Sequence, residues 1–201
     1  METYFGLHAL EGEWHSLLPR YLMVSELLRG KRVLEVGCSH GVGTALLEHL
    51  GIDNVVAIDH RPERIQAAQN QFEALASHFQ DMFYEELAFE SDSFDAVICL
   101  SDTFPISDEA VLAEVTRVLR PEGLFVAAWA SVGAYGLDKV LPRLGDPRQP
   151  GEDLDPTRMV DNPHAVFQER FAHTRVLHQH PTLLYTFLPA DPETPPTDET
   201  L

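Results

Sequence analysis

The pattern of apolar and polar positions first predicts a helix and then a buried strand. Apolar residues recur at helical spacing between Glu11 and Arg29, and Gly30 follows as a stop signal. Pro19 falls inside this run, so the helix begins there or bends there. The short apolar run of residues 31–36 follows and is typical of a buried strand.

Strands and helices continue to alternate as far as residue 130. Glycine-rich and proline-containing turns separate them, at residues 37–43 and 121–123. This alternation favours βαβ units and a parallel sheet. We therefore expect a Rossmann-like, doubly wound α/β fold with helices on both faces of the sheet. The further strands predicted are 54–59, 79–82 (a weak one), 94–100 and 124–130, and the further helices are 44–50, 63–78 with Pro62 at its first position, and 107–119.

The pattern weakens after residue 130. Residues 131–163 are rich in Pro and Gly and are long for a plain connection, so they form a functional loop or lid, or are partly disordered. A helix is predicted over 165–171, and strands over 174–179 and 182–188 complete a mostly parallel seven-stranded sheet with an antiparallel edge strand. Residues 189–201 hold four prolines and four acids without a base, which predicts a disordered tail.

Length and charge limit the number of domains and the classes of binding partner that we expect. A chain of 201 residues suits one domain, here residues 1–188 with residues 1–30 as an N-terminal helical lid. The net charge of −18 opposes binding to nucleic acid, since that affinity rests on Lys and Arg. No apolar run reaches the roughly 18 residues of a membrane helix. Residues 1–10 lack a secretory pattern, so we expect a cytoplasmic protein. We expect it to be a monomer or homodimer.

The cysteines and histidines do not predict a metal site. Cys38 and Cys99 lie inside apolar runs, where we expect buried thiols in a reducing compartment. His178 and His180 lie two apart on a predicted strand and could share one face, but no third ligand is evident.

The glycine-rich turn at residues 37–43 is the main candidate for a ligand-binding site. A predicted strand ends, glycines turn the chain and a helix begins, and this is where α/β proteins bind nucleotides. The dinucleotide fingerprint needs Gly at its first, third and sixth positions, which here are Gly37, Ser39 and Val42, so that match fails. The phosphate-loop pattern fails too, because no Gly-Lys-Ser/Thr follows.

The spacing of Glu35, Gly37 and Gly41 does fit the first motif of class I S-adenosylmethionine-dependent methyltransferases. Over about residues 31–130 the chain resembles that family, and the ending at residues 117–123 resembles its small-molecule branch. Ser39 departs from the family pattern, because a glycine usually stands there. The resemblance implies S-adenosyl-L-methionine as cofactor, a small-molecule acceptor and a Rossmann-like fold.

Several residues carry the predicted cofactor site. Asp59 ends a predicted strand about 20 residues after the turn, where an acid binds ribose hydroxyls, although it could instead cap the next helix. The resemblance implies that Asp81 meets the adenine amino group and that Met82 packs on the ring, although the segment up to residue 94 is about two residues longer than usual. The full predicted set is Glu35, Gly37, Cys38, Ser39, Gly41, Asp59, His60, Asp81, Met82 and Ser101.

Catalytic residues are harder to predict, because the sulfonium methyl group needs a base only when the nucleophile must lose a proton. His15 and Asp102 are the leading candidates, with His8 and His164 behind them. The sequence leaves one alternative function open: a methyltransferase-like domain that has lost catalysis and serves as a binding or regulatory partner. A nicotinamide dehydrogenase is opposed by the glycine spacing.

Overall fold

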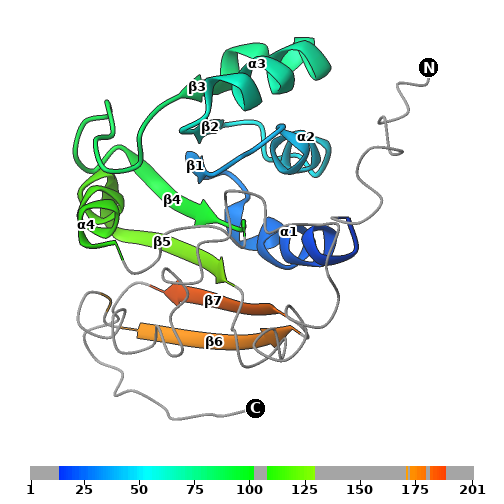
Figure 1. Cartoon of the computed structure of the whole chain (residues 1–201). Helices are drawn as coiled ribbons and strands as arrows, with labels where there is room; N and C mark the ends of the chain where they lie inside the picture. Colours follow the sequence, from blue (N-terminus) through cyan, green and yellow to red (C-terminus); the bar gives the residue numbers. More distant parts are fainter. Residues whose placement is uncertain (1–13, 102–107, 130–170, 172, 180–181, 189–201) are drawn as a thin grey trace, which may run out of the picture.

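A seven-stranded sheet organises the computed structural model, which describes residues 14–101, 108–129, 171, 173–179 and 182–188. The strand order is β3-β2-β1-β4-β5-β7-β6 (Figure 1). The first five strands pair in parallel, which confirms the predicted parallel sheet. The strands are β1 (Val33–Val36), β2 (Val55–Asp59), β3 (Phe79–Asp81), β4 (Phe94–Cys99), β5 (Leu119–Trp129), β6 (His173–Gln179) and β7 (Thr182–Leu188).

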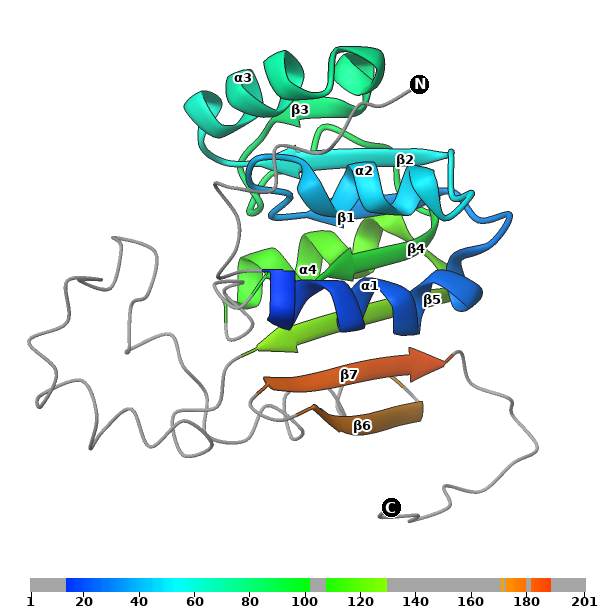
Figure 2. The same cartoon turned by 90° about the vertical axis from the view of Figure 1, so that its right-hand side faces the viewer.

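Helices cover both faces of this sheet, as Figures 1 and 2 show. Helices α1, α2 and α3 lie on one face and α4 lies on the other. Alternate residues of β4 explain both layers: Ala96 and Ile98 pack with α1 and α2, while Val97 and Cys99 pack with α4. The described helices are α1 (Trp14–Leu28), α2 (Val42–His49), α3 (Pro62–Gln71), the 3-10 helix η2 (Glu73–His78) and α4 (Glu109–Val118).

Two boundaries within the described residues differ by more than two residues from those predicted. The helix expected over 63–78 ends at Gln71, because Phe72 leaves helical geometry (φ −121°, ψ 62°), and η2 follows as a separate element. The fifth strand begins at Leu119 rather than at Leu124. Leu119 pairs with Phe94 and Leu124 with Ala96, so residues 120–123 bulge out of the ladder where a plain turn was expected.

The antiparallel strand lies one position inside the sheet edge. β7 pairs antiparallel with β5 and with β6, so β6 forms the edge and runs in the direction of β5. The two sequences account for this order, because TLLYTFL is more apolar than HTRVLHQ and a central strand is covered on more sides. The predicted helix over 165–171 and the linker 131–163 fall, apart from Phe171, outside the described residues.

The strand order creates one favoured binding position. β1 pairs with β2 on one side and with β4 on the other, so the connections that leave β1 and β4 run in opposite directions. Ligands of open α/β sheets bind at the carboxyl ends of strands at such a reversal. Among the described helices, none has the length and apolar character that crossing a bilayer requires.

Candidate functional site

The glycine turn follows β1 at the carboxyl edge of the sheet and is tied to the neighbouring strand. The backbone N–H groups of Gly37 and Cys38 both donate to the carbonyl of Ile58, at 2.8 and 3.0 Å. Gly37 has a φ of 80° and Gly41 a φ of 79°, values that glycine adopts without steric cost. Gly41 then precedes the first residue of α2, and its N–H donates to the Cys38 carbonyl at 2.9 Å. The turn is therefore anchored at both ends.

Ser39 takes a left-handed backbone conformation, with φ at 52°. A residue with a Cβ pays for this conformation, and glycine is the usual occupant. The Ser39 N–H donates to Asp59 Oδ2 at 3.0 Å, which helps to hold the conformation. Ser39 thus takes the backbone conformation that a glycine would take without steric cost.

Asp59 ends β2 with its carboxylate buried, only 1% of the residue being exposed. Besides the contact with Ser39, its Oδ1 accepts from the backbone N–H of Arg61 at 3.1 Å, and an Arg64 nitrogen lies 3.9 Å from Oδ2. Asp59 therefore joins the glycine turn to the residue that precedes α3, although the N-cap of that helix is Arg61 and not Asp59. Its position beside the turn is the one predicted for a ribose-binding acid.

The Glu35 side chain lies on the face of β1 that packs against α1 and α2. Its Oε1 accepts from the Tyr21 hydroxyl at 2.5 Å and its Oε2 from the Thr44 hydroxyl at 2.6 Å. Burial raises the Glu35 pKa, while the two hydrogen bonds act in the opposite direction. Both carboxylate oxygens thus bond to protein groups, and Glu35 links α1, β1 and α2 beneath the turn.

His60, Tyr84 and Ser101 converge near Gly37. The Tyr84 hydroxyl lies 3.1 Å from His60 Nδ1, and the two rings meet edge to face with centroids 5.1 Å apart. A Cβ placed on Gly37 would lie 3.6 Å from the Tyr84 hydroxyl and 3.7 Å from the Ser101 Cβ. The absent side chain of Gly37 therefore leaves a cradle between residues that follow β2, β3 and β4.

Asp81 and Met82 lie one strand further along the same edge. Asp81 is exposed and is the register partner of Asp59. The Met82 N–H donates to the Asp59 carbonyl at 3.0 Å, and its Sδ accepts from the Ala88 N–H at 3.4 Å. The predicted cofactor residues thus lie at or next to the carboxyl ends of β1 to β4, but the Glu35 side chain faces α1 and α2, and the Cys38 side chain packs in a core cluster with residues of α3.

The candidate bases cannot be placed. Asp102, His8 and His164 lie outside the described residues, and His15 belongs to α1 but its side chain is not described. Within the described ranges, no three His, Cys, Asp or Glu residues gather as metal ligands would.

Two buried residues of this edge, Arg20 and Tyr84, were not predicted from the sequence. Arg20 is fully buried and donates to the Leu100 carbonyl at 2.7 Å, where β4 has just ended. A single cation on the apolar face of the first predicted helix was the available signal. Tyr84 is also buried, but its position after a short strand in a loop gave no periodic signal.

Comparison with known proteins agrees with this geometry. Residues 33–123 match the family model described as methyltransferase domain. The chain is 36% identical over 133 residues to a probable phthiotriol/phenolphthiotriol dimycocerosates methyltransferase 2 of Mycobacterium ulcerans, covering 58% of this chain and 50% of that protein. It is 36% identical over 132 residues to a ubiquinone biosynthesis O-methyltransferase of Xanthomonas oryzae pv. oryzae, covering 58% and 54%.

The chain thus spans about half the length of these curated relatives. Among solved structures, the PH0226 protein of Pyrococcus horikoshii OT3 superposes with a TM-score of 0.65 at 21% identity, over 94% of both chains. At that identity the likeness shows a shared fold. Together these matches confirm the resemblance inferred from the motifs.

Proposed function

We propose that this chain, whose residues 33–123 match the methyltransferase domain model, is a class I S-adenosylmethionine-dependent methyltransferase that transfers the cofactor's methyl group to a small molecule. The observation that carries the proposal is the carboxyl edge of β1 and β2. There the glycine turn, with Gly37 and Gly41 at positive φ, is hydrogen-bonded through Ser39 to the buried Asp59. The seven-stranded, doubly wound sheet supports the same assignment.

The residues at this edge fit S-adenosylmethionine. The absent side chain of Gly37 would let a ligand approach the backbone, and Asp59 and Asp81 would offer carboxylates for the ribose hydroxyls and the adenine amino group. Ser101 lies beside Gly37 and would face the sulfur end. When bound, the cofactor supplies an electrophilic methyl group on a sulfonium. The chain then has to hold cofactor and acceptor in line and exclude water.

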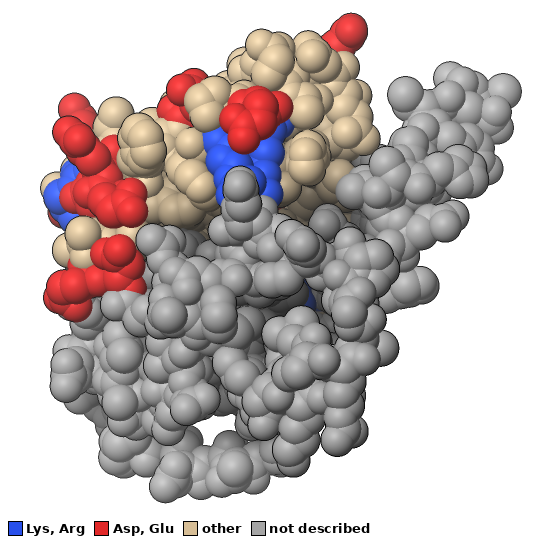
Figure 3. Space-filling view, in the orientation of Figure 1, with Lys and Arg blue, Asp and Glu red and all other residues tan. Residues whose placement is uncertain are grey.

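For the acceptor, we favour an oxygen atom of a largely apolar small molecule. One relative is named for phthiotriol and phenolphthiotriol dimycocerosates and the other for ubiquinone biosynthesis and O-methylation. The charge supports a neutral or cationic acceptor over a polyanion, because acids outnumber bases by 32 to 14. Figure 3 shows acidic side chains gathered over the connection between β3 and β4, where Glu85, Glu86, Glu90 and Asp92 are exposed.

The remaining parts of the proposal follow from the sequence. A base from His15 or Asp102 would accept the hydroxyl proton. Of the two predicted lids, residues 131–163 would cover the acceptor, because residues 1–30 contain α1, which packs on the sheet. We place the reaction in the cytoplasm, where the cofactor is supplied, and expect a monomer or a homodimer.

The first test is isothermal titration with S-adenosylhomocysteine. Asp59→Ala alone is a poor probe, because Asp59 also holds the turn and the start of α3. Gly37→Ala is sharper, since its methyl group meets nothing closer than 3.6 Å and fills the cradle, so that its cost to the free protein is the backbone strain at a φ of 80°. We expect micromolar binding by the wild type and loss of binding by folded Gly37→Ala. Release of S-adenosylhomocysteine in a screen of phenols and hydroxylated lipids would then identify the acceptor. No binding by the folded wild type would favour the alternative of a partner domain without catalysis.

A further inference from the structure

We propose that Tyr84 is a cofactor-binding residue, held over Gly37 by a clamp that Glu114 and Arg117 form on the connection between β3 and β4. This inference rests on the proposed function, because the ligand it names is the nucleoside thioether that the glycine turn would bind. No motif predicted Tyr84. The case for it comes from three features of the structure: the position of the hydroxyl, the packing of the ring, and the polar contacts that fix the backbone nearby.

The Tyr84 hydroxyl lies where three strand ends meet. It is 3.1 Å from Nδ1 of His60, the residue after Asp59, and it borders the cradle of Gly37 together with Ser101. A ligand lying on the glycine turn and reaching Asp59 has to pass this hydroxyl. Burial raises the Tyr84 pKa, and the nearby Asp59 carboxylate raises it further, so the hydroxyl stays protonated and can donate a hydrogen bond.

The Tyr84 ring is part of the core, which fixes the position of its hydroxyl beside Gly37. It packs with Val36, Ile58 and Leu87, and 8% of the residue is exposed. Swinging it aside would expose the apolar surface that this packing buries. A ligand therefore meets the hydroxyl in its present place.

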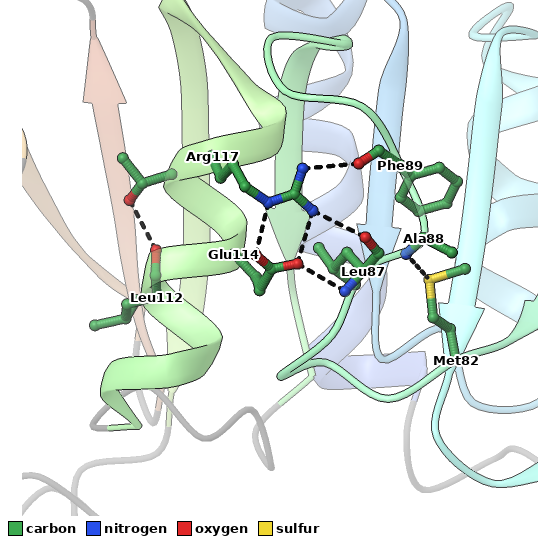
Figure 4. Close-up of polar contacts among 8 residues, drawn as sticks. Met82, Leu87, Ala88, Phe89, Leu112, Glu114 and Arg117 are labelled. Carbon is green, nitrogen blue, oxygen red and sulfur yellow. Dashed lines mark hydrogen bonds and ion pairs between the residues drawn. The ribbon is translucent and has the colours of Figure 1, made fainter.

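A clamp from α4 fixes the backbone three to five residues after Tyr84 (Figure 4). The Leu87 N–H donates to Glu114 Oε2 at 2.7 Å. The Arg117 guanidinium donates to the carbonyls of Leu87 and Phe89, both at 2.8 Å, and to Glu114 at 2.6 and 2.7 Å. The planar fork of arginine suits such multiple bonding, and lysine cannot reproduce it. Glu114 and Arg117 are therefore positioning residues, which act on the ligand through Tyr84.

The test measures the affinity of the whole chain for S-adenosylhomocysteine by isothermal titration. Tyr84→Phe removes the hydroxyl and keeps the ring, and Arg117→Lys weakens the clamp. Arg29→Lys is the matched control, because Arg29 forms the same kind of i,i+3 pair, with Glu26 on the exposed side of α1. We expect Tyr84→Phe to weaken binding about three- to tenfold, the usual effect of one lost hydrogen bond. Arg117→Lys should also weaken binding, and Arg29→Lys should not.

A double-mutant cycle separates positioning from general stability. If the clamp acts through Tyr84, the combined Tyr84→Phe and Arg117→Lys variant binds no more weakly than Tyr84→Phe alone. Thermal unfolding without ligand should show that Tyr84→Phe is folded, with a Tm lowered only by the loss of the hydrogen bond to His60. Unchanged or tighter binding by Tyr84→Phe overturns the inference, and tighter binding would show that the side chain obstructs the crevice. Absence of binding by the wild type instead defeats the proposed function and, with it, this inference.

Discussion

Gly43 offers the sharpest test of how the helices are anchored beneath the glycine turn. It lies inside α2, where alanine is intrinsically more favourable than glycine by about 1 kcal/mol. Propensity alone therefore predicts that Gly43→Ala stabilises the protein. The structure predicts the opposite, because an added Cβ would lie 1.9 Å from the Tyr21 hydroxyl and 2.7 Å from Glu35 Oε1.

The expected loss of stability in Gly43→Ala follows from the contacts that Tyr21 would lose. Moving its hydroxyl away breaks the bond to the buried Glu35 carboxylate, which costs about 1.5–3 kcal/mol for a charged partner. Overpacking of the surrounding core costs about 1–3 kcal/mol more. After subtracting the gain in helix propensity, the net loss is about 3 kcal/mol. For a chain of this size that corresponds to a fall in Tm of roughly 6–12 °C.

Urea unfolding at 25 °C, followed by far-ultraviolet circular dichroism, measures this loss. Gly43→Ala should lower the midpoint with an unchanged m-value. In a Tyr21→Ala background the same substitution should become neutral or slightly stabilising, because the clash is gone and Glu35 can retreat. A Gly43→Ala protein as stable as the wild type would refute the reasoning, and so would an equal penalty in both backgrounds.

Three further predictions concern the same region. Ser39→Gly should stabilise the protein by about 0.5–1 kcal/mol in thermal unfolding, because it removes the backbone strain of a serine in the left-handed conformation. A Tm below that of the wild type would show that Ser39 is not strained. Burial raises the Glu35 pKa above 4.5, so the stability from its protonated form is fully present below that value and lost as pH rises through the raised pKa. The advantage of the wild type over Glu35→Gln should therefore be larger at pH 4.5 than at pH 7 in urea titrations, and a constant difference would argue against a raised pKa. Gly41→Ala places a Cβ 2.6 Å from the Phe79 ring and should lower the free energy of unfolding by about 3 kcal/mol or more. Gly30→Ala, with nothing within 4 Å, should lower it only by the strain of a left-handed residue, about 1–2 kcal/mol. Similar losses for the two variants would show that the Phe79 contact is unimportant.

The sequence predicted the architecture because its signals are local. Apolar periodicity and turn residues identified the elements from α1 to α4, and the order of strands and helices implied a parallel sheet. Asp59 and the glycine turn could be placed together, since both end strands and the carboxyl ends of parallel strands share one edge.

Side-chain direction within the site could not be predicted in the same way. β1 is buried on both faces, so the letters VLEV do not reveal which face receives Glu35. The structure shows that it faces α1 and α2, where Tyr21 and Thr44 supply hydroxyl donors. The position of Tyr84 depends on contacts between α4 and a loop more than 20 residues earlier, and no local pattern reports such contacts.

The buried thiol of Cys38 has a consequence for an enzyme that handles an alkylating agent. A cysteine in the glycine turn would be exposed to self-methylation if it were a thiolate, because the thiolate is the nucleophilic form. Here the side chain is buried, and burial together with the charges of Glu35 and Asp59 raises the Cys38 pKa well above its ordinary value. Burial, reinforced by these two carboxylates, therefore favours the protonated thiol, and under the proposed function this would protect Cys38 from methylation by a cofactor bound at the turn.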